Sequence, residues 1–433
     1  MNEWRNWGRN VTATPAEVVD VDTTRGIVDA LAGAAARRLR VRVAGSGHSF
    51  TPLVATDGML LRLGGLSGVI GVDRDRRRVR VLAGTPLHVL NPALQALGLA
   101  LPNLGDIDRQ TISGAIATGT HGTGTRLQGI AAAVSGLTLV LADGSVLACS
   151  AEEEPEVFAA ARVGLGALGV VTEVELQCVP AFRLHAKEAA ASLTELLPVI
   201  QAEADAHDHL DVLWFPHTDR VLVKRNDVVE AGEGPPPLAR WRARLDDDLL
   251  ANRLFELVNR VGSVLPAAVP TVNRISARVL SSREFADDSW KVFCSSREVR
   301  FVESEYAVPR SSVEAVLHEL HAWFARTDAP VPFPVEVRFV GADDAWLSTA
   351  YERENAYVAV HQYHRMDAAP LFGAFEAIVA EHAGRPHWGK VHTLGADRLR
   401  ELYPRFDDFR AVRDRLDPER RFTNEHVAHL LDG

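Results

Sequence analysis

A carboxylate and a guanidinium lie two residues apart in the chain, as Glu336 and Arg338, between the apolar residues Val335, Val337 and Phe339. Strict alternation of this kind predicts a β-strand that carries both charged side chains on one face, about 7 Å apart. A carboxylate can accept a proton, and a cation can stabilise a developing negative charge. A solvated strand face with an ion pair is the alternative interpretation.

A second candidate group lies near the C-terminus, where residues 385–390 include His387, Trp388, Gly389 and Lys390. A lysine ammonium can stabilise negative charge in the same way as a guanidinium. The alternative is a packed surface loop without a chemical role.

Residues 41–50 begin as an alternating β pattern, break at Gly45 and Gly47, and then present His48. Glycine lets backbone N–H groups approach a ligand that a Cβ atom would keep away, so this stretch is a candidate anion cradle. It is not the dinucleotide fingerprint of a Rossmann domain, because a third glycine and a clear following helix are missing. A tight turn with a surface histidine remains the alternative.

Another glycine-rich stretch, residues 111–124, alternates small side chains and hydroxyl groups without any charge. Such a sequence suits a backbone wrapped closely around a large planar or phosphorylated ligand. His121 lies within it, either as a ligand contact or as a histidine that satisfies loop carbonyl groups.

The composition of the 433 residues sets limits on the kind of protein. A chain of this length with 47% hydrophobic and 24% charged residues predicts two or three globular domains. The net charge of −10, from 47 basic and 57 acidic residues, argues against a nucleic-acid surface and favours small-molecule partners.

The three cysteines, Cys149, Cys178 and Cys294, are far apart and support neither a disulfide framework nor a zinc site, so no metal site is predicted. The first residues contain no apolar signal segment, and no run approaches the roughly 18 to 20 apolar residues of a membrane span. We therefore expect a cytoplasmic protein.

Short β patterns alternate with helical ones in the N-terminal part of the chain. Three of the β runs, 59–63, 68–73 and 79–83, suggest one small mixed sheet, and Asp143-Gly144 predicts a hairpin with a type I′ turn. Thr85 and Pro86 predict the start of a helix that Pro92 should kink or restart. The other predicted strands are 39–43, 137–141, 146–149 and 170–178, and the predicted helices are 23–37, 85–97 and 156–168.

A domain boundary is predicted near Val179-Pro180, beyond which the pattern changes. Residues 232–237 predict an exposed loop, and an antiparallel sheet backed by helices is the economical arrangement for the later part of the chain. The predicted strands are 299–307, 335–340 and 357–363, the predicted helices are 241–264 and 311–326, and 397–431 is predicted as mixed helix and loop.

Taken in order, the stretches around His48, His121 and Lys390 resemble the sugar-1,4-lactone oxidases and alditol oxidases of the vanillyl-alcohol-oxidase flavoprotein superfamily. The resemblance covers nearly the whole chain. It implies an α+β fold with a superfamily-type FAD-binding domain at 1–180, a substrate cap domain with an antiparallel sheet and flanking helices at 181–380, and a C-terminal segment at 381–433 that returns to the first domain.

The resemblance also implies an FAD cofactor bonded covalently through His48. No second residue, such as a cysteine, that could also bond the flavin is evident in the sequence. This argues against the bicovalent oligosaccharide oxidases. The residues expected to contact FAD are Val43, Ala44, Gly45, Ser46, Gly47, His48, Ser49, Gly105, Asp106, Thr111, Gly114, Thr118, Gly119, His121, Val171 and His387.

By the same resemblance, Glu336, Arg338 and Lys390 are the catalytic residues at the reactive edge of the flavin. The implied reaction oxidises the C2 hydroxyl of a gulono-, galactono- or arabinono-1,4-lactone, with hydride passing to flavin N5. Asp106 stands where alditol oxidases tend to have serine, which favours the lactone over C1 oxidation of a linear alditol. A flavin-storing binding protein, which would not need the three catalytic residues together, is the alternative from another class.

Gly105 bears on the electron acceptor. In the plant dehydrogenase branch of the resembling family, an alanine at this position restricts the approach of oxygen to the reduced flavin. A glycine leaves this path open, because close-packed interiors have no slack for an extra methyl group. We therefore expect oxygen as acceptor and hydrogen peroxide as product, with a dehydrogenase that uses another acceptor as the alternative.

Overall fold

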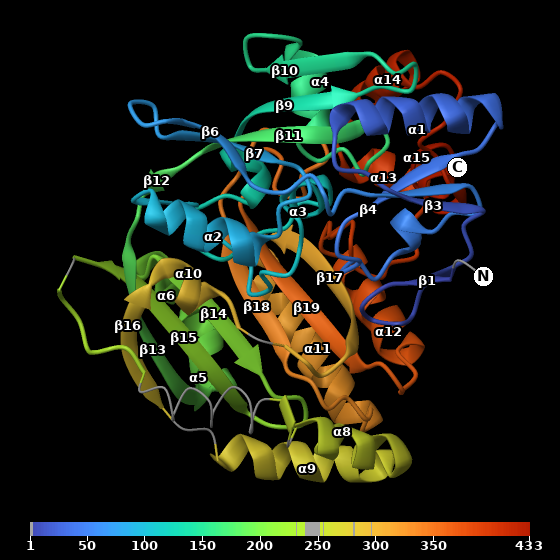
Figure 1. Cartoon of the computed structure of the whole chain (residues 1–433). Coiled ribbons are helices and arrows are strands. Elements are labelled where there is room, and N and C mark those ends of the chain that lie inside the picture. The colour runs from blue at the N-terminus through green and yellow to red at the C-terminus, as the bar shows by residue number, and fades with distance from the viewer. Residues whose placement is uncertain (1–2, 231, 239–251, 254, 280–281, 296) are drawn as a thin grey trace.

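The computed structural model describes residues 3–230, 232–238, 252–253, 255–279, 282–295 and 297–433. Figure 1 shows small sheets and helices of the N-terminal part at the top, and a large sheet with its helices below them. The chain contains both helices and sheets, and most of the paired strands are antiparallel. The predicted α+β class is therefore confirmed.

A three-stranded parallel sheet carries the first glycine stretch. Its order is β3 (Glu17–Asp20), β5 (Met59–Arg62) and β4 (Val41–Ala44), and helix α1 (Thr24–Ala36) connects β3 to β4. The Thr23 side chain accepts a hydrogen bond from the Gly26 N–H at 3.1 Å, which begins the helix. The predicted helix 23–37 and strand 39–43 are confirmed within a few residues.

The neighbouring five-stranded sheet is antiparallel, so the prediction of one small mixed sheet is wrong. Strand β5 pairs in the parallel sheet, whereas the next two β runs pair with each other, and the second of them also pairs with residues 173–177, far away in sequence, which local alternation cannot indicate. The order is β10 (Val146–Ser150), β9 (Val134–Val140), β11 (Val170–Gln177), β7 (Arg78–Leu82) and β6 (Val69–Asp73).

The predicted β9–β10 hairpin is present, but the type I′ turn is wrong. A type I′ turn needs positive φ at both central residues, and of the Asp143-Gly144 pair only Gly144 has it, at 85°. The Asp143 carboxylate accepts hydrogen bonds from the Ser145 N–H at 2.9 Å and its hydroxyl at 2.6 Å. The Leu141 N–H bonds the Ser145 carbonyl at 2.9 Å, so the loop is longer than two residues.

Two predicted helices differ in detail. Helix α2 (Leu87–Ala96) has Pro86 at its N-cap and continues through Pro92 as one element, so the predicted first residue and restart are wrong. Helix α4 (Pro155–Ala161) ends well before residue 168, because Leu165 and Gly166 have φ of 53° and 63° and turn the chain back toward the sheet.

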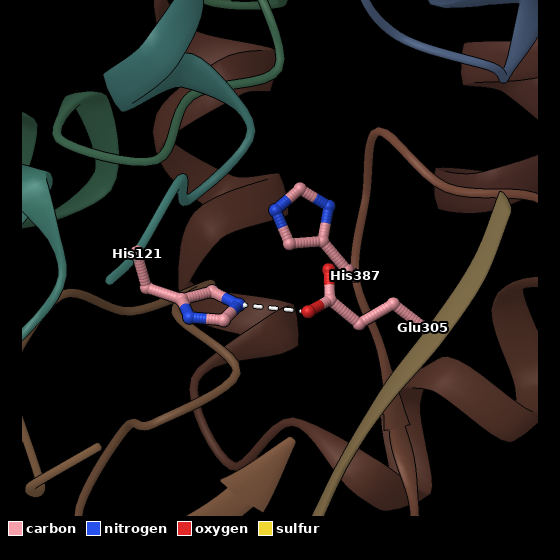
Figure 2. Close-up of side chains that lie close together, drawn as sticks. All are labelled: His121, Glu305 and His387. Carbon is pink, nitrogen blue, oxygen red and sulfur yellow. Dashed lines mark ion pairs between the residues drawn. The ribbon is translucent and has the colours of Figure 1, made fainter. Parts of the chain in front are cut away.

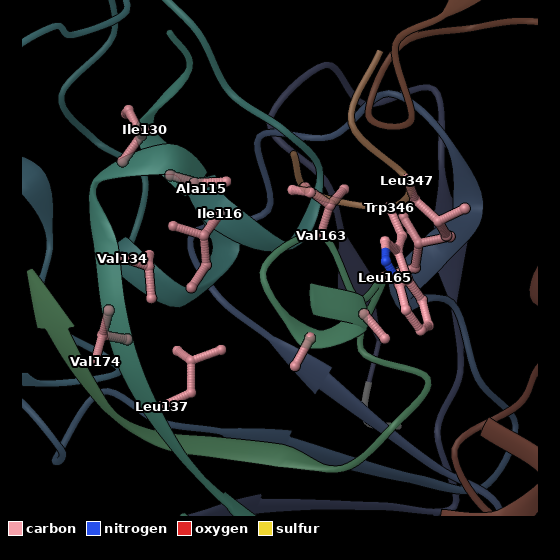
Figure 3. Packing of buried hydrophobic residues seen from close by; sticks show 14 of the residues in the cluster. Ala115, Ile116, Ile130, Val134, Leu137, Val163, Leu165, Val174, Trp346 and Leu347 are labelled. Atoms are coloured by element: carbon pink, nitrogen blue, oxygen red, sulfur yellow. The ribbon is translucent and has the colours of Figure 1, made fainter. Parts of the chain in front are cut away.

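One hydrophobic core joins the N-terminal part to later segments (Figure 3). Ala115 and Ile116 of α3 (Ile112–Ala117) belong to the same cluster as Trp346 and Leu347 from the loop after β18. The cluster also contains buried residues of the last three helices, α13 (Ala396–Leu402), α14 (Phe406–Leu416) and α15 (Glu425–Leu431). The end of the chain thus packs against its N-terminal part (Figure 1).

The large sheet has eight strands, all antiparallel to their neighbours. The sequence predicted β17, β18 and β19 and missed the other five, four of which lie in the stretch between residues 183 and 288. The order is β16 (Arg283–Asp288), β13 (Arg183–Ser192), β15 (Arg220–Val229), β14 (His209–Trp214), β18 (Val335–Val340), β19 (Asn355–Tyr363), β17 (Phe301–Pro309) and β20 (Arg385–Pro386).

Helices α11 (Val313–Thr327) and α12 (Ala369–Ala380) cover the apolar face of this sheet. Leu317, Leu320 and Phe324 of α11 pack with Val335 and Val337 of β18 in a second core. The predicted helix 311–326 is confirmed, whereas α12 was not predicted. The opposite face of the sheet is polar and faces the N-terminal part of the molecule.

Shorter elements complete the chain. Helix α8 confirms the end of the predicted helix 241–264. Residues 241–251 and 254 of that prediction lie outside the described residues. Residues 232–237 form an exposed loop, as predicted. These elements are β1 (Trp4–Arg5), β2 (Thr12–Ala13), η1 (Pro52–Val54), β8 (Leu99–Ala100), η2 (Ile130–Ala133), β12 (Val179–Pro180), α5 (Leu193–Leu196), η3 (Leu197–Val199), α6 (Ile200–Ala206), α8 (Phe255–Val264), η5 (Pro266–Ala268), α9 (Val269–Ser276), η6 (Ala277–Val279), α10 (Ser289–Phe293) and η7 (Arg310–Ser312).

The large sheet begins with β13 at Arg183, close to the predicted boundary. The domain limits at residues 180 and 380 stay predictions. None of the helices in the described ranges combines the length and apolar character needed to cross a bilayer.

Candidate active site

A first cavity of about 1040 Å³ lies between the loop after β4, helix α3 and the turn after α4. Its wall consists mainly of backbone and of small or apolar side chains. Ten of the residues predicted to contact FAD line it, namely Val43, Gly45, Ser46, Gly47, His48, Ser49, Thr111, Gly114, Thr118 and Val171.

Glycines let the two predicted stretches meet in this wall. A Cβ atom at Gly45 would lie 2.5 Å from Thr111 Oγ1, and one at Gly114 would lie 3.0 Å from the same oxygen. Gly47 has φ of 69°, which side chains disfavour. The result is a cradle of exposed backbone that fits a large ligand with a phosphate and a planar ring, as FAD has.

The buried side chain of Arg42 fixes the wall of this cavity. Its guanidinium donates hydrogen bonds to the carbonyl oxygens of Leu53 at 2.6 Å, Leu165 at 2.8 Å, Gly166 at 3.0 Å and Phe422 at 2.5 Å. Burial lowers the pKa of Arg42 to about 10, partly offset by the carboxylate of Asp417, so it stays charged at neutral pH. One arginine thus ties the β4 strand to the turn after α4 and to the C-terminal segment.

A second cavity, of about 680 Å³, lies between the same loops and the polar face of the large sheet. His48, Ser49, Gln110 and Thr118 line both cavities, so the two spaces are adjacent. The predicted residues Gly105, Asp106, His121, Glu336, Arg338, His387 and Lys390 all line the second cavity.

His48 lies at the junction of the two cavities. Its ring stacks against Trp7, with centroids 5.5 Å apart and planes inclined by 27°. Its Nδ1 atom is buried and has no hydrogen-bond partner among the described residues. Burial, with Lys390 and Arg109, lowers the pKa of His48 to about 4. The ring is therefore neutral at pH 7 and offers a nitrogen to a ligand.

The strand register gathers ionisable side chains on the polar face of the sheet. Directly opposite residues of paired strands have their side chains on the same face. Asp211 is opposite Arg338, Arg338 is opposite Tyr357, and Glu303 is opposite His361. The ionisable residues of this face include Asp211 of β14, Glu336 and Arg338 of β18, Tyr357 and His361 of β19, and Glu303 and Glu305 of β17.

Arg338 is the cation shared by three carboxylates. Its Nη2 atom lies 2.6 Å from Glu336 Oε1, 3.6 Å from Asp106 Oδ1 and 3.7 Å from Asp211 Oδ2. Burial opposes ionisation of Asp106, but Arg297, with which it forms an ion pair, and Arg338 outweigh this effect and lower its pKa. The Asp106 carboxylate is therefore a fixed negative charge.

Glu336 behaves differently from Asp106. Burial raises its pKa, and Asp211 and Asp106 add to this effect, while Arg338 opposes it; the result is a pKa of about 7. A carboxyl group with this pKa exchanges a proton near neutral pH, as a general acid or base must.

Lys390 belongs to a second charged group on the same face. Its ammonium forms an ion pair with Glu303 and lies 4.0 Å from Glu305 Oε2. Although burial disfavours the charge of Lys390, the two glutamates outweigh it and raise its pKa. Lys390 is thus a fixed cation across the cavity from Arg338.

Figure 2 shows His121, Glu305 and His387 together in this wall of the cavity. His121 Nε2 lies 3.2 Å from Glu305 Oε1, and its Nδ1 lies 2.9 Å from the Gly122 carbonyl oxygen. Both ring nitrogens of His121 thus face oxygen acceptors. His121 and Glu305 are both buried beside each other in this wall.

The same three residues have the spacing of a metal site, since their candidate ligand atoms lie within 4.8 Å of one another. However, His387 Nδ1 accepts a hydrogen bond from the Gly389 N–H at 3.0 Å, and burial lowers the pKa of this histidine to about 4. The neutral ring then carries its hydrogen on Nε2, so neither nitrogen has a free lone pair for a metal. The absence of a metal site stays a prediction.

Ala44 and Gly119 are the two predicted contact residues that line neither cavity. Ala44 is the last residue of β4 and is buried behind the wall. Gly119 has φ of 76° in the turn that follows α3. Their expected contacts with FAD stay predictions, like those of the other fourteen residues.

Five ionisable residues of the site were missed. Glu303 and Glu305 alternate with apolar residues in β17 just as Glu336 and Arg338 do in β18, so the same signal was available in a strand that was predicted. His361 is a similar case in β19. Asp211 lies in a strand that was not predicted, and Arg297 lies in a loop that gives no local signal.

Comparison with known proteins yields two family matches. Residues 174–430 match the family described as D-arabinono-1,4-lactone oxidase. Residues 15–150 match the family described as FAD binding domain. The FAD-binding match covers both glycine-rich stretches and strand β4 beside the first cavity. The lactone-oxidase match covers the whole large sheet.

Two similar relatives span almost the full chain. An L-gulono-1,4-lactone dehydrogenase of Mycobacterium tuberculosis is 41% identical over 99% of both chains. An L-gulonolactone oxidase of Bos taurus is 34% identical over 99% of this chain and 98% of its own. Among solved structures, a cholesterol oxidase from Brevibacterium sterolicum has a TM-score of 0.83 at 17% identity, covering 99% of this chain and 97% of its own, which supports the fold alone.

Proposed function

The chain belongs to the D-arabinono-1,4-lactone oxidase family of FAD-dependent oxidoreductases, and on this basis we propose that it oxidises the C2 hydroxyl group of a sugar 1,4-lactone. Gulono-, galactono- and arabinono-lactone are the candidate substrates. The observation that carries the proposal is the second cavity, where Glu336, Arg338 and Lys390 face the loops that hold His48 and His121.

When bound, FAD takes up the hydride that leaves the hydroxyl-bearing carbon. The chain has to bind the lactone, remove the hydroxyl proton and stabilise the negative charge on oxygen. Arg338 and Lys390 are fixed cations on two sides of the cavity and would stabilise this charge. Glu336, with its pKa near 7, would accept the proton.

The remaining carboxylates would orient the substrate. Asp106, Glu303 and Glu305 each keep a negative charge because a cation lies beside it. Carboxylate oxygens accept hydrogen bonds from hydroxyl groups, and a sugar lactone presents several of these. A linear alditol would make similar contacts, so oxidation of its C1 hydroxyl is the second candidate reaction.

A substrate panel separates these two reactions. The purified flavoprotein is mixed under nitrogen with gulono-, galactono- and arabinono-1,4-lactone, and with the corresponding alditols, while the flavin absorbance is followed. Rapid bleaching by a lactone and slow bleaching by the alditols supports the proposal. The reverse order would identify an alditol oxidase.

Residues of the first cavity would hold FAD, and we propose a covalent bond between His48 and its 8α-methyl group. The neutral ring, the unpartnered Nδ1 atom and the position between the cavities support this bond. Acid-precipitated protein should then stay yellow, and His48→Ala should release its flavin on denaturation. Free FAD in the wild-type supernatant would contradict the covalent bond.

We propose oxygen as the electron acceptor, with hydrogen peroxide as product, because Gly105 has no methyl group to fill the narrow space beside the His121 carbonyl oxygen. The M. tuberculosis relative is named a dehydrogenase, which favours another acceptor as the second candidate. Reduction of the enzyme with lactone under nitrogen, followed by mixing with aerated buffer, distinguishes the two by the rate of reoxidation. The cytoplasmic location and the absence of a nucleic-acid partner stay predictions of the sequence.

A further inference from the structure

Helices α8 and α9 lie at the lower edge of the molecule in Figure 1, at the opposite end from the β9–β10 hairpin. Residues of both helices expose large apolar side chains. None of the residues of these two helices lines the second cavity. This surface therefore needs an explanation other than catalysis.

The exposed side chains of α8 lie on one helical face. Leu257, Val261 and Val264 are 59%, 48% and 78% exposed, and Leu265, one residue beyond the helix, is 60% exposed. Their spacing of four, three and one residues places them on one side of a helix with 3.6 residues per turn. We call these four residues and Ile275 of α9, which is 58% exposed, the apolar patch.

The inner face of α8 is only partly apolar. Asn259 is fully buried, and its amide donates a hydrogen bond to the Phe255 carbonyl at 2.7 Å. Gly262 faces Val269 so closely that a Cβ atom would lie 2.9 Å from Val269 Cγ2. A helix on the surface of a protein in water normally has its apolar face inside. On α8, Phe255 packs inward against Phe333 beside the buried Asn259 and Gly262, while three other large apolar side chains of the helix are exposed.

The patch is also concentrated. Five of the eleven exposed large apolar side chains among the described residues lie between positions 257 and 275. Isolated exposed apolar residues are normal, whereas a contiguous group marks a contact with a partner or a membrane.

Within the segment that carries the patch, positive charges outnumber negative ones, and Arg274 lines a hollow that also contains Asp219 and Asp328. Residues 255–278 contain three arginines, Arg260, Arg274 and Arg278, and one acid, Glu256, in a chain with net charge −10. Glu256 is bonded to Arg260 at 2.7 Å and to the Tyr363 hydroxyl at 3.0 Å. Arg274 and Arg278 are exposed and lie within 4.0 Å of no carboxylate in the described ranges.

We propose that the apolar patch inserts into the surface of an anionic lipid bilayer, with Arg274 and Arg278 on the lipid headgroups. Apolar side chains that enter the headgroup boundary, next to arginines, are the features of a helix that lies on a membrane. A second copy of this chain fits less well, because a symmetric contact through the patch would bring the arginines of both copies together.

Vesicle co-sedimentation tests this surface without using the reaction. Wild-type holoprotein should sediment with vesicles of phosphatidylcholine and phosphatidylglycerol. Val264→Asp with Leu265→Asp should lower the partition coefficient by about tenfold or more, since each side chain loses its apolar burial. The matched control is Val146→Asp, which replaces a valine that is 54% exposed on β10. It should bind vesicles like wild type.

Charge and self-association give the other arms of the experiment. Binding should weaken with added salt, with pure phosphatidylcholine vesicles and with Arg274→Glu, while lactone oxidation without vesicles stays unchanged in every variant. Equal sedimentation of wild type and the double aspartate variant would overturn the proposal. So would a wild-type dimer in sedimentation velocity that the double variant abolishes, with no lipid binding.

Discussion

The two adjacent cavities of this protein are built on opposite principles. The first has Arg42 as its one charged side chain among neutral residues and backbone, whereas the second is lined by Asp106, Arg297, Glu303, Glu305, Glu336, Arg338 and Lys390. Glycine-rich loops form the first, and the polar face of an antiparallel sheet forms most of the second. Close contact with backbone gives affinity for a large ligand, while fixed charges favour one reaction at one position.

The comparison predicts that changes in the two cavities have separable effects. Changes of the charged residues in the second cavity should slow flavin reduction and leave the bound flavin unchanged. Changes in the first cavity should lower the flavin content and leave the rate per bound flavin unchanged.

The largest effect is expected for Arg338→Ala. The substitution removes a cation that would stabilise the alkoxide. It should therefore raise the activation free energy of flavin reduction by about 3 to 4 kcal/mol. It also leaves Glu336, Asp106 and Asp211 without their shared cation. Stopped-flow reduction under nitrogen measures the rate, and the visible spectrum reports the flavin.

Arg126→Ala is the matched control, because its ion pair with Asp208 is at the surface and its side chain is 65% exposed. We expect a change of less than about 1 kcal/mol there. A near-wild-type rate for Arg338→Ala would place the reaction outside the second cavity.

The next effect is expected for Gly45→Ala. The new Cβ atom would lie 2.5 Å from Thr111 Oγ1, so the two loops of the first cavity must separate, at a cost of about 1 to 3 kcal/mol. Flavin content and thermal stability should both fall. Adding Thr111→Ala removes the colliding oxygen and should restore part of the flavin, although it also removes the cap of α3. An unchanged flavin content in Gly45→Ala would contradict the close packing of the two loops.

The pH dependence follows from Glu336. If its carboxylate accepts the substrate proton, kcat/KM should be constant above pH of about 7 and fall about tenfold per pH unit below it, since the protonated form cannot act as a base. Glu336→Gln should remove this limb while lowering the plateau. A limb that persists in Glu336→Gln would assign the proton to another group.

The smallest effect is expected for Gly105→Ala. Its Cβ atom would lie 3.2 Å from the His121 carbonyl oxygen and 3.3 Å from Thr120 Cγ2, so these neighbours need to move only a few tenths of an ångström. We expect slower reoxidation by oxygen and little change in stability or in flavin reduction. Equal reoxidation rates in wild type and Gly105→Ala would show that this position does not restrict oxygen.

Local patterns in the sequence predicted the parts of the fold that depend on local spacing. The helix 23–37, the strand that follows it and the alternation of Glu336 and Arg338 were correct because side-chain periodicity determines them. The turn at Asp143-Gly144 was wrong, since hydrogen bonds from Ser145 to Asp143 select another loop.

Features that depend on distant pairing could not be predicted in the same way. Strands β5 and β6 are neighbours in sequence but belong to different sheets. Glu303 and Glu336 face one cavity because β19 lies between their strands, and Arg297 meets Asp106 across 191 residues. The resemblance to the family predicted that Glu336, Arg338 and Lys390 lie together. It gave no indication of their five ionisable neighbours, which are Asp211, Arg297, Glu303, Glu305 and His361.

The most direct test of the account is the anaerobic reduction of the flavin by L-gulono-1,4-lactone carrying deuterium at C2. We predict that the unlabelled lactone bleaches the flavin, that deuterium at C2 slows the bleaching, and that Arg338→Ala slows it further while its flavin spectrum stays that of wild type. Bleaching at the same rate with both lactones, or no bleaching by any aldonolactone, would contradict oxidation at C2 in the second cavity.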